Sequence, residues 1–122
     1  MTRARLALGR RGEALAAERL GGLGYELIDR NYRCPAGELD LVARQADTWV
    51  FVEVRTRRGQ ALGTPEASVT PRKRRHLIAA AQTYLQERGL TAVAWRIDFV
   101  AVEFTPRGEL VRVDVIENAV TG

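Results

Sequence analysis

Two carboxylates, Asp40 and Glu53, are predicted to oppose each other across a β-hairpin. If the hairpin turns between Ala46 and Asp47, the numbers of opposed residues sum to 93, so Asp40 faces Glu53. Opposed side chains have Cβ atoms about 4.5–5.5 Å apart, where two like charges repel and destabilise a sheet. A bound divalent cation would relieve that repulsion, since Mg²⁺ is commonly held by one or two carboxylates with water and phosphate oxygens. The pattern therefore predicts a Mg²⁺ site, in which Mn²⁺ can substitute.

The same register carries two further side chains onto this face of the sheet. It places Glu38 opposite Arg55 and Arg44 opposite Trp49, and strand alternation puts Glu38 and Arg55 beside the two carboxylates. The prediction depends on a turn of even length, because an odd loop would put the carboxylates on opposite faces. Two simpler interpretations stay open, in which Arg55 neutralises one carboxylate or the carboxylate is solvated.

A third carboxylate, Glu13, is predicted on the inward face of an N-terminal helix. At about 100° per residue, several small or apolar positions fall within a third of the helical circumference around it. They are Leu6, Gly9, Ala16, Ala17 and Leu20. Leu8 and Leu15 are expected on the opposite side. The alternative for Glu13 is a partly buried ion pair with an arginine.

The basic residues are concentrated in one segment. Residues 55–75 carry a net charge of +6, whereas the rest of the chain carries −2 and the whole chain +4. Besides Arg55, the basic side chains of the segment are Arg57, Arg58, Arg72, Lys73, Arg74 and Arg75. Such a local excess is typical of a surface that binds nucleic acid, although a solvated arginine-rich loop is the simpler alternative. Lys73 is the sole lysine among 19 basic residues.

Two helices and five strands are predicted to position these residues. Helices are expected over residues 3–23 and 71–88, and strands over 25–33, 37–44, 49–55, 94–103 and 110–116, with a loop over 56–68. Thr70 offers an N-cap oxygen to the second helix, which Pro71 can begin. Asp98, an acid within an apolar strand, is expected to have a structural role and to pair with Arg96 or Arg112, and support of the carboxylate cluster is its alternative. The order predicts an α/β fold with a central mixed five-stranded sheet flanked by helices.

The composition excludes several classes of protein. A length of 122 residues favours one domain over residues 1–122. No run approaches the roughly 20 apolar residues of a membrane span, and the arginine-rich start lacks the apolar core of a secretory signal. The single cysteine, Cys34, excludes a disulfide framework, and the single histidine, His76, excludes a His-rich metal site. We therefore expect a cytoplasmic protein without a membrane partner.

Several motifs together resemble the YraN-like family of small bacterial proteins, over nearly the whole chain. They are Gly12–Glu13, Asn31–Tyr32–Arg33, Gly37–Glu38–Leu39–Asp40–Leu41, Val50–Phe51–Val52–Glu53–Val54–Arg55–Thr56–Arg57, Lys73, Ala80–Ala81 with Tyr84–Leu85, and Arg96–Ile97–Asp98–Phe99–Val100. The family is similar to archaeal Holliday-junction resolvases and belongs with the PD-(D/E)XK nucleases. This resemblance implies a restriction-endonuclease-like core. It also implies a metal site made by Glu13, Asp40 and Glu53, with the Val54 carbonyl as a further oxygen ligand.

Arg55 departs from the nuclease pattern, which has a lysine at this position to orient or deprotonate the attacking water. A guanidinium stays protonated, so Arg55 cannot act as a general base. It can still stabilise phosphate charge or position a water. Lys73 could supply the missing ammonium from the second helix, whereas a phosphate contact or a solvated side chain are its alternatives.

Three functions are compatible with the sequence. The first is Mg²⁺-dependent, resolvase-type hydrolysis of DNA phosphodiesters, with Glu13, Asp40, Glu53 and Arg55 at the catalytic site; a resolvase-type role would also require a symmetric homodimer. The second is a nucleic-acid-binding module that keeps the nuclease fold but cuts slowly or not at all, as Arg55 would allow. The third is a protein-interaction subunit whose arginine-rich segment meets an acidic partner.

Overall fold

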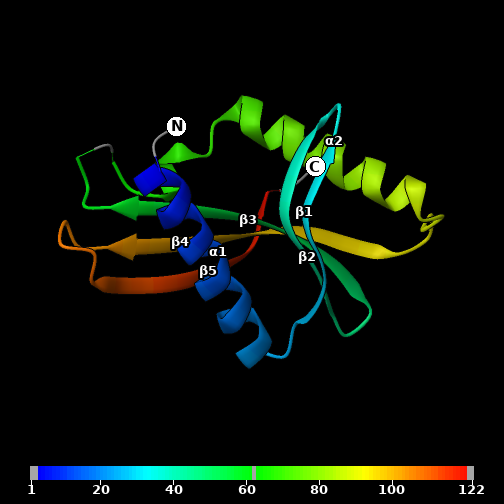
Figure 1. Ribbon diagram of the computed structural model, residues 1–122. Helices are drawn as coiled ribbons and strands as arrows, with labels where there is room; N and C mark the ends of the chain where they lie inside the picture. Colours follow the sequence, from blue (N-terminus) through cyan, green and yellow to red (C-terminus); the bar gives the residue numbers. More distant parts are fainter. Residues whose placement is uncertain (1–2, 62, 121–122) are drawn as a thin grey trace.

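The computed structural model describes residues 3–61 and 63–120 as two helices, a 3₁₀ turn and five strands (Figure 1). The elements are α1 (Arg3–Gly22), β1 (Glu26–Cys34), β2 (Gly37–Gln45), β3 (Thr48–Arg58), η1 (Glu66–Ser68), α2 (Pro71–Glu87), β4 (Ala94–Phe104) and β5 (Leu110–Val120). The strands form one sheet in the order β1-β2-β3-β4-β5, in which only β3 and β4 run parallel. The predicted α/β layout with a mixed five-stranded sheet is confirmed.

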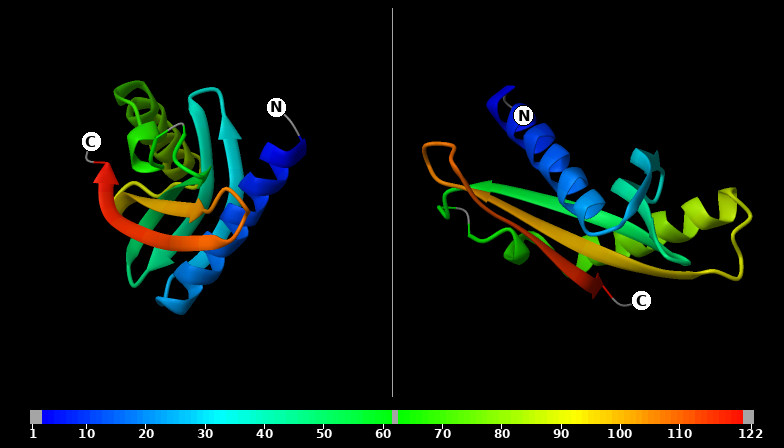
Figure 2. Two further views of the ribbon diagram at one scale, coloured as in Figure 1. Left: turned by 90° about the vertical axis from the view of Figure 1, so that its left-hand side faces the viewer. Right: turned by 90° about the horizontal axis from the view of Figure 1, so that it is seen from below.

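The two helices cover opposite faces of the sheet (Figure 2). On one face, Ala16 and Leu20 of α1 pack against apolar side chains of β2, β3 and β4. On the other, α2 buries Leu77, Ala80, Ala81, Tyr84 and Leu85 against a cluster that includes Phe51 and Ile97. No helix in the described parts of the chain is long and apolar enough to cross a membrane.

α1 is rotated relative to the face predicted from its sequence. Gly12, Ala16 and Leu20 are buried, and Leu8 and Leu15 pack partly against the core. Leu6 is 46% exposed, so the prediction that it faces inward was wrong. Residues 3–7 are all exposed, so Leu6 lies at an end of the helix that is uncovered on every side. Further along, a Cβ added at Gly12 would lie 2.0 Å from Thr56 Oγ1 of β3, and this close approach brings the Gly12 side of the helix against the sheet.

Two strands are longer than predicted. β3 continues to Arg58, through the segment expected to begin the loop, because its last residues pair with the end of β4. β5 continues to Val120, and Asn118 near its end has a positive φ of 51°. The Asn118 N–H donates to the Asp98 carboxylate at 2.8 Å, which ties this extension to β4.

Asp98 has the structural role predicted for it. Its side chain is fully buried and accepts hydrogen bonds from Tyr25 Oη (2.8 Å) and Arg96 Nε (2.9 Å) as well as from β5. Of the two arginines expected as partners, Arg96 makes the ion pair. The network links β4 to β5 and to Tyr25, which lies between α1 and β1.

Candidate functional site

The β2–β3 hairpin has the register that the sequence predicted, as far as its ladder extends. The pairs run from Gln45 opposite Thr48 to Leu41 opposite Val52, with numbers that sum to 93 throughout. Beyond the last of these pairs, Asp40 uses its side chain to reach β3, and its Oδ2 accepts a hydrogen bond from the Val54 N–H at 2.7 Å. The carboxylate of Asp40 is thereby held against the backbone that carries Glu53.

Glu53 is the buried centre of the site. It is only 3% exposed, and its Oε1 contacts two cations from different elements. Arg55 Nε of the same strand lies at 3.1 Å, and Lys73 Nζ from the first turn of α2 lies at 3.5 Å. Arg55 therefore pairs with a carboxylate, as one of the simpler interpretations of the sequence supposed, and Lys73 pairs with the same carboxylate.

Both carboxylates are held in an environment that disfavours their charge. Burial raises the pKa of Glu53 to about 8, with repulsion from Asp40 as the second cause, while Lys73 and Arg55 act in the opposite direction. Burial also raises the pKa of Asp40, and Glu38 adds to that shift, against the Val54 N–H and the same two cations. Burial and the neighbouring acids thus both disfavour a negative charge on each of these two carboxyl groups.

Glu13 lies at the edge of this pair. It follows Gly12, whose contact with Thr56 brings α1 against β3, and its side chain is half-buried. Burial is the main cause of its raised pKa, with further contributions from Asp40 and Glu38 and an opposing one from Arg30. Glu13 is therefore within electrostatic reach of the other acids.

The acidic side chains of the site could bind a cation through two carboxylates but not through three. Within residues 3–61 and 63–120, no three His, Cys, Asp or Glu side chains converge as a metal-binding group. Asp40 and Glu53 nevertheless offer carboxylate oxygens beside each other, and Mg²⁺ often takes one or two such ligands and fills its remaining positions with water. The residues present fit a Mg²⁺ ion in this form, with Glu13 outside the pair.

Besides Arg55 and Lys73, which contact Glu53, the basic residues of segment 55–75 lie either on α2 or at the end of β3. Arg72, Arg74 and Arg75 are exposed on the first turn of α2, beside the site. Arg74 also lines, with Glu53, a hollow of about 190 Å³ between α2 and the sheet.

The other two arginines lie along the end of β3. The half-buried Arg57 donates from Nη1 to the Thr56 carbonyl oxygen at 3.4 Å. Arg58 donates from Nε to the Pro106 carbonyl oxygen at 2.9 Å, so it is held at the β4–β5 turn. The segment is therefore not one continuous patch.

Two features of the site go beyond what sequence patterns predict. No pattern in the sequence indicates the ion pair of Lys73 with Glu53, and none indicates the influence of Arg30 on Glu13. A signal for the first exists in Gly37, because an added Cβ there would lie 3.1 Å from the His76 carbonyl oxygen. That close approach draws the start of α2 onto β2, so that the side chain of Lys73 reaches the carboxylates.

The chain is similar to bacterial proteins whose names state no activity. The model of a family described as "Uncharacterised protein family UPF0102" matches residues 12–102, which contain all the side chains of the site. A UPF0102 protein of Moorella thermoacetica is 47% identical over 119 residues, covering 98% of this chain and 99% of the relative. UPF0102 proteins of Pelotomaculum thermopropionicum and Geobacter sulfurreducens are 44% and 50% identical, covering 98% and 78% of this chain and 99% and 74% of the relatives.

Proposed function

The chain belongs to the uncharacterised protein family UPF0102, and we propose that it is a metal-dependent, endonuclease-like protein that hydrolyses phosphodiester bonds in DNA. The proposal depends on one observation above the others. Lys73 Nζ lies 3.5 Å from the Glu53 carboxylate that Arg55 also contacts. α2 therefore supplies the ammonium that a Glu-X-Lys motif would have supplied from position 55. Membership of the PD-(D/E)XK superfamily is part of the proposal.

The carboxylate pair is the place for the metal. Asp40 and Glu53 would hold Mg²⁺ or Mn²⁺, with the Val54 carbonyl as a further oxygen and Glu13 acting through water or a second ion. The bound ion would neutralise charge on the phosphodiester and activate the water that attacks it. A bound cation would also favour the charged forms of both carboxyl groups, against the burial and the repulsion that raise their pKa values.

The two cations act on the scissile phosphate and on the water. Arg55 remains protonated and donates to a non-bridging phosphate oxygen, which stabilises the charge that grows there during the reaction. Lys73 donates from Nζ to the attacking water and so orients it. Overall, one water molecule is added across a P–O bond: its oxygen bonds to phosphorus, the bond to the leaving oxygen breaks, and the leaving oxygen gains a proton.

The exposed arginines of α2 would bind the rest of the nucleic acid. Arg72, Arg74 and Arg75 stand on the first turn of the helix, where their charges oppose the positive end of the helix dipole. Backbone phosphates would relieve this unfavourable arrangement. Contacts of this kind give affinity without sequence preference and with a strong dependence on salt.

A second candidate function is a DNA-binding module without cleavage. It is favoured by the way in which Arg55 and Lys73 already neutralise Glu53, and by the lack of a third converging ligand in the described parts of the chain. In that case the basic residues would bind phosphates in the same way, and the carboxylates would have only a structural role.

Cleavage assays with matched carboxylate variants test the proposal. Branched, flapped, single-stranded and duplex DNA would be incubated with Mg²⁺ or Mn²⁺ and the wild-type protein, Asp40→Asn, Glu53→Gln, Arg55→Lys and the exposed control Glu18→Gln. We expect Asp40→Asn and Glu53→Gln to cut about 100-fold more slowly or worse, and Arg55→Lys and Glu18→Gln to stay active. Cleavage that survives both carboxylate changes would refute the site. Salt-sensitive binding without cleavage by any of these proteins would select the second function.

A further inference from the structure

β5 is an open edge of the sheet that differs from the opposite edge. The sheet order leaves β1 and β5 each with one neighbour. Both edge strands are irregular in places, β1 between Leu27 and Asp29 and β5 on either side of its central stretch, Arg112 to Ile116. That central stretch pairs without a break to β4 and is apolar except for Arg112 and Asp114, whereas β1 carries charged residues along most of its length. An open edge with few charges is a template for another strand.

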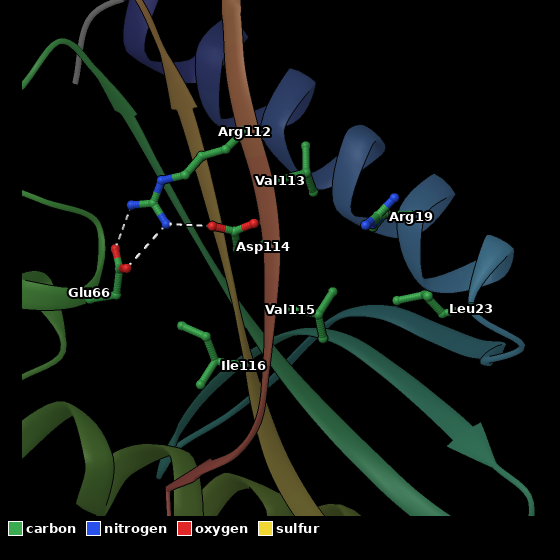
Figure 3. A pocket seen from close by; sticks show the side chains of 8 residues that line it. All are labelled: Arg19, Leu23, Glu66, Arg112, Val113, Asp114, Val115 and Ile116. Atoms are coloured by element: carbon green, nitrogen blue, oxygen red, sulfur yellow. Dashed lines mark hydrogen bonds and ion pairs between the residues drawn. The ribbon is translucent and has the colours of Figure 1, made fainter.

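Exposed apolar surface is concentrated along this edge. Six large apolar side chains of the described residues are at least 36% exposed, and four of them lie on β5 or at the end of α1. These four are Leu23, Leu110, Val111 and Ile116. A hollow of about 430 Å³ follows the strand, with Arg19 of α1 and Leu23 just after it along one side and Glu66 along the other (Figure 3). The surface is therefore shaped to receive a partner that covers both the strand and the end of the helix.

The sequence of β5 is complementary to itself when it is reversed about Val113. We propose that β5 pairs antiparallel with β5 of a second copy of this chain, around a two-fold axis at Val113. Arg112 of each copy then lies opposite Asp114 of the other. Two such sheets join into one sheet of ten strands, and the two ion pairs flank the axis. This inference does not rest on the proposed function.

Charge selects this register over its neighbours. A two-fold axis perpendicular to the joined sheet keeps each side chain on the same face in both copies. Residues that oppose each other share a face, so the residue on the axis must oppose its own copy. A register centred on Asp114 would set two aspartates against each other, and one centred on Arg112 would set two arginines against each other. Like charges directly opposed are destabilising, whereas the register centred on Val113 gives only opposite charges beside the axis.

The charges on this face are unbalanced within one chain. Arg112 contacts three carboxylates, with Glu66 at 2.8 Å, Asp114 at 3.0 Å and Glu103 at 3.3 Å. One guanidinium cannot neutralise three acids, and the side chain of Asp114 remains 58% exposed. A second copy brings its own Arg112 together with the same three acids, so it does not change this ratio. In the register centred on Val113, however, Arg112 of each copy lies opposite the exposed Asp114 of the other, which gives Asp114 a second guanidinium partner. This reciprocal match of Arg112 with Asp114 is why we expect the partner to be another copy of the same chain.

Sedimentation of charge variants tests the interface. Asp114→Arg would place arginines opposite Arg112 on both sides of the axis, and we expect the dimer dissociation constant to rise at least about tenfold. Glu26→Arg makes the same charge change on the exposed edge strand β1 and should leave the dimer intact. A wild-type protein that stays monomeric at 200 µM, roughly ten times a micromolar-range dissociation constant, would overturn the proposal. An equal effect of Asp114→Arg and Glu26→Arg on the dimer would also overturn it.

Cross-linking tests the register without relying on a charged variant. In a Cys34→Ser background, Val113→Cys would bring two thiols together at the axis, where opposed Cα atoms lie about 4.5–5.5 Å apart and a disulfide can form. Asp114→Cys in the same background would keep its thiols apart. Mild oxidation should give a covalent dimer with Val113→Cys in at least about tenfold greater yield than with Asp114→Cys. Equal yields, or a greater yield with Asp114→Cys, would overturn this register.

Discussion

Glu53 is a buried carboxylate with two cationic neighbours, and the more informative of them is Lys73. Arg55 follows Glu53 by two residues on the same strand face, so their contact is a local consequence of strand geometry. Lys73 reaches Glu53 from the other side of a long loop and from a different element. A contact of that kind must be produced by the fold as a whole, which is why it is the better indication of a site.

Replacing Lys73 separates a role in the reaction from a role in binding. We expect Lys73→Gln to lower the cleavage rate at saturating DNA by about 100-fold or more and to change DNA affinity by less than about threefold. The exposed neighbour Arg75 is the matched control, since Arg75→Gln should weaken affinity and leave the saturated rate nearly unchanged. Single-turnover kinetics and filter binding measure the two quantities. If Lys73→Gln behaves like Arg75→Gln, Lys73 only contacts phosphate.

The raised pKa of Glu53 predicts how stability depends on pH. The folded protein holds this proton with a pKa of about 8, above the ordinary value of 4.5, so the folded state is favoured below pH 4.5 and loses that advantage as pH rises toward 8. We expect the unfolding free energy of the metal-free protein to fall by up to about 1 kcal/mol per pH unit across this range.

Glu53→Gln removes the titrating group and should give a shallower pH dependence. Urea titrations of both proteins in EDTA at pH 5.5, 7.0 and 8.5 (conditions chosen to span roughly the window between the two pKa values) measure the difference. Identical slopes in the two proteins would show that Glu53 does not carry the raised pKa.

At the scale of elements, the approach of α1 to β3 positions the third acid. Gly12 lies against Thr56, and Glu13 is the next residue along the helix. A side chain at position 12 would push the helix away from the strand and carry Glu13 with it. The glycine is therefore part of the arrangement of the site, although it contributes no chemical group.

Gly12→Ala should destabilise the fold by about 1–3 kcal/mol, because its Cβ would lie 2.0 Å from Thr56 Oγ1. Gly9→Ala is the control, since nothing lies within 4 Å of its added Cβ and alanine favours a helix. Adding Thr56→Ala to Gly12→Ala removes the clashing oxygen and should restore part of the loss. Thermal unfolding of the four proteins measures this, and equal stabilities of Gly12→Ala and Gly9→Ala would contradict the contact.

Much of the sheet and of the hairpin could be predicted, because local patterns determine them. The polar turn at Ala46 and Asp47 fixed the register, and strand alternation then brought Asp40, Glu53 and Arg55 to one face. The hydrogen bond from the Val54 N–H to Asp40 could not be foreseen, since it forms beyond the last pair of the ladder. The rotation of α1 was missed for a similar reason, because it is set by one contact with Thr56 and not by helical periodicity.

At the scale of the whole molecule, the net charge of +4 conceals an uneven distribution. Arg58 is held at the β4–β5 turn, whereas Arg72, Arg74 and Arg75 project from α2 beside the carboxylates. A bound nucleic acid would meet the α2 arginines and the acidic pair together. The acids would need a cation in order to accept a phosphate, so the proposed metal site and the proposed binding surface belong to the same function.

Salt dependence tests whether the α2 arginines are the binding surface. Each phosphate contact contributes about 0.9 to the slope of log K against log salt concentration, so Arg74→Ala with Arg75→Ala should reduce that slope by about 2. Arg19→Ala removes an exposed arginine of α1 and should leave the slope nearly unchanged. Fluorescence anisotropy between 50 and 200 mM salt (roughly the range in which phosphate contacts are most visible) gives these slopes. An unaltered slope in the double variant would exclude both residues from the surface.

Direct binding of Mn²⁺ tests whether Asp40 and Glu53 form a metal site. The free-ion electron paramagnetic resonance signal would be followed at pH 8 during titration of Mn²⁺ into the wild-type protein, Asp40→Asn, Glu53→Gln and the exposed control Glu18→Gln. We expect saturable binding to wild type and Glu18→Gln that is weakened at least about tenfold in each of the other two variants. Equal Mn²⁺ affinity in all four proteins would contradict a metal site at this carboxylate pair.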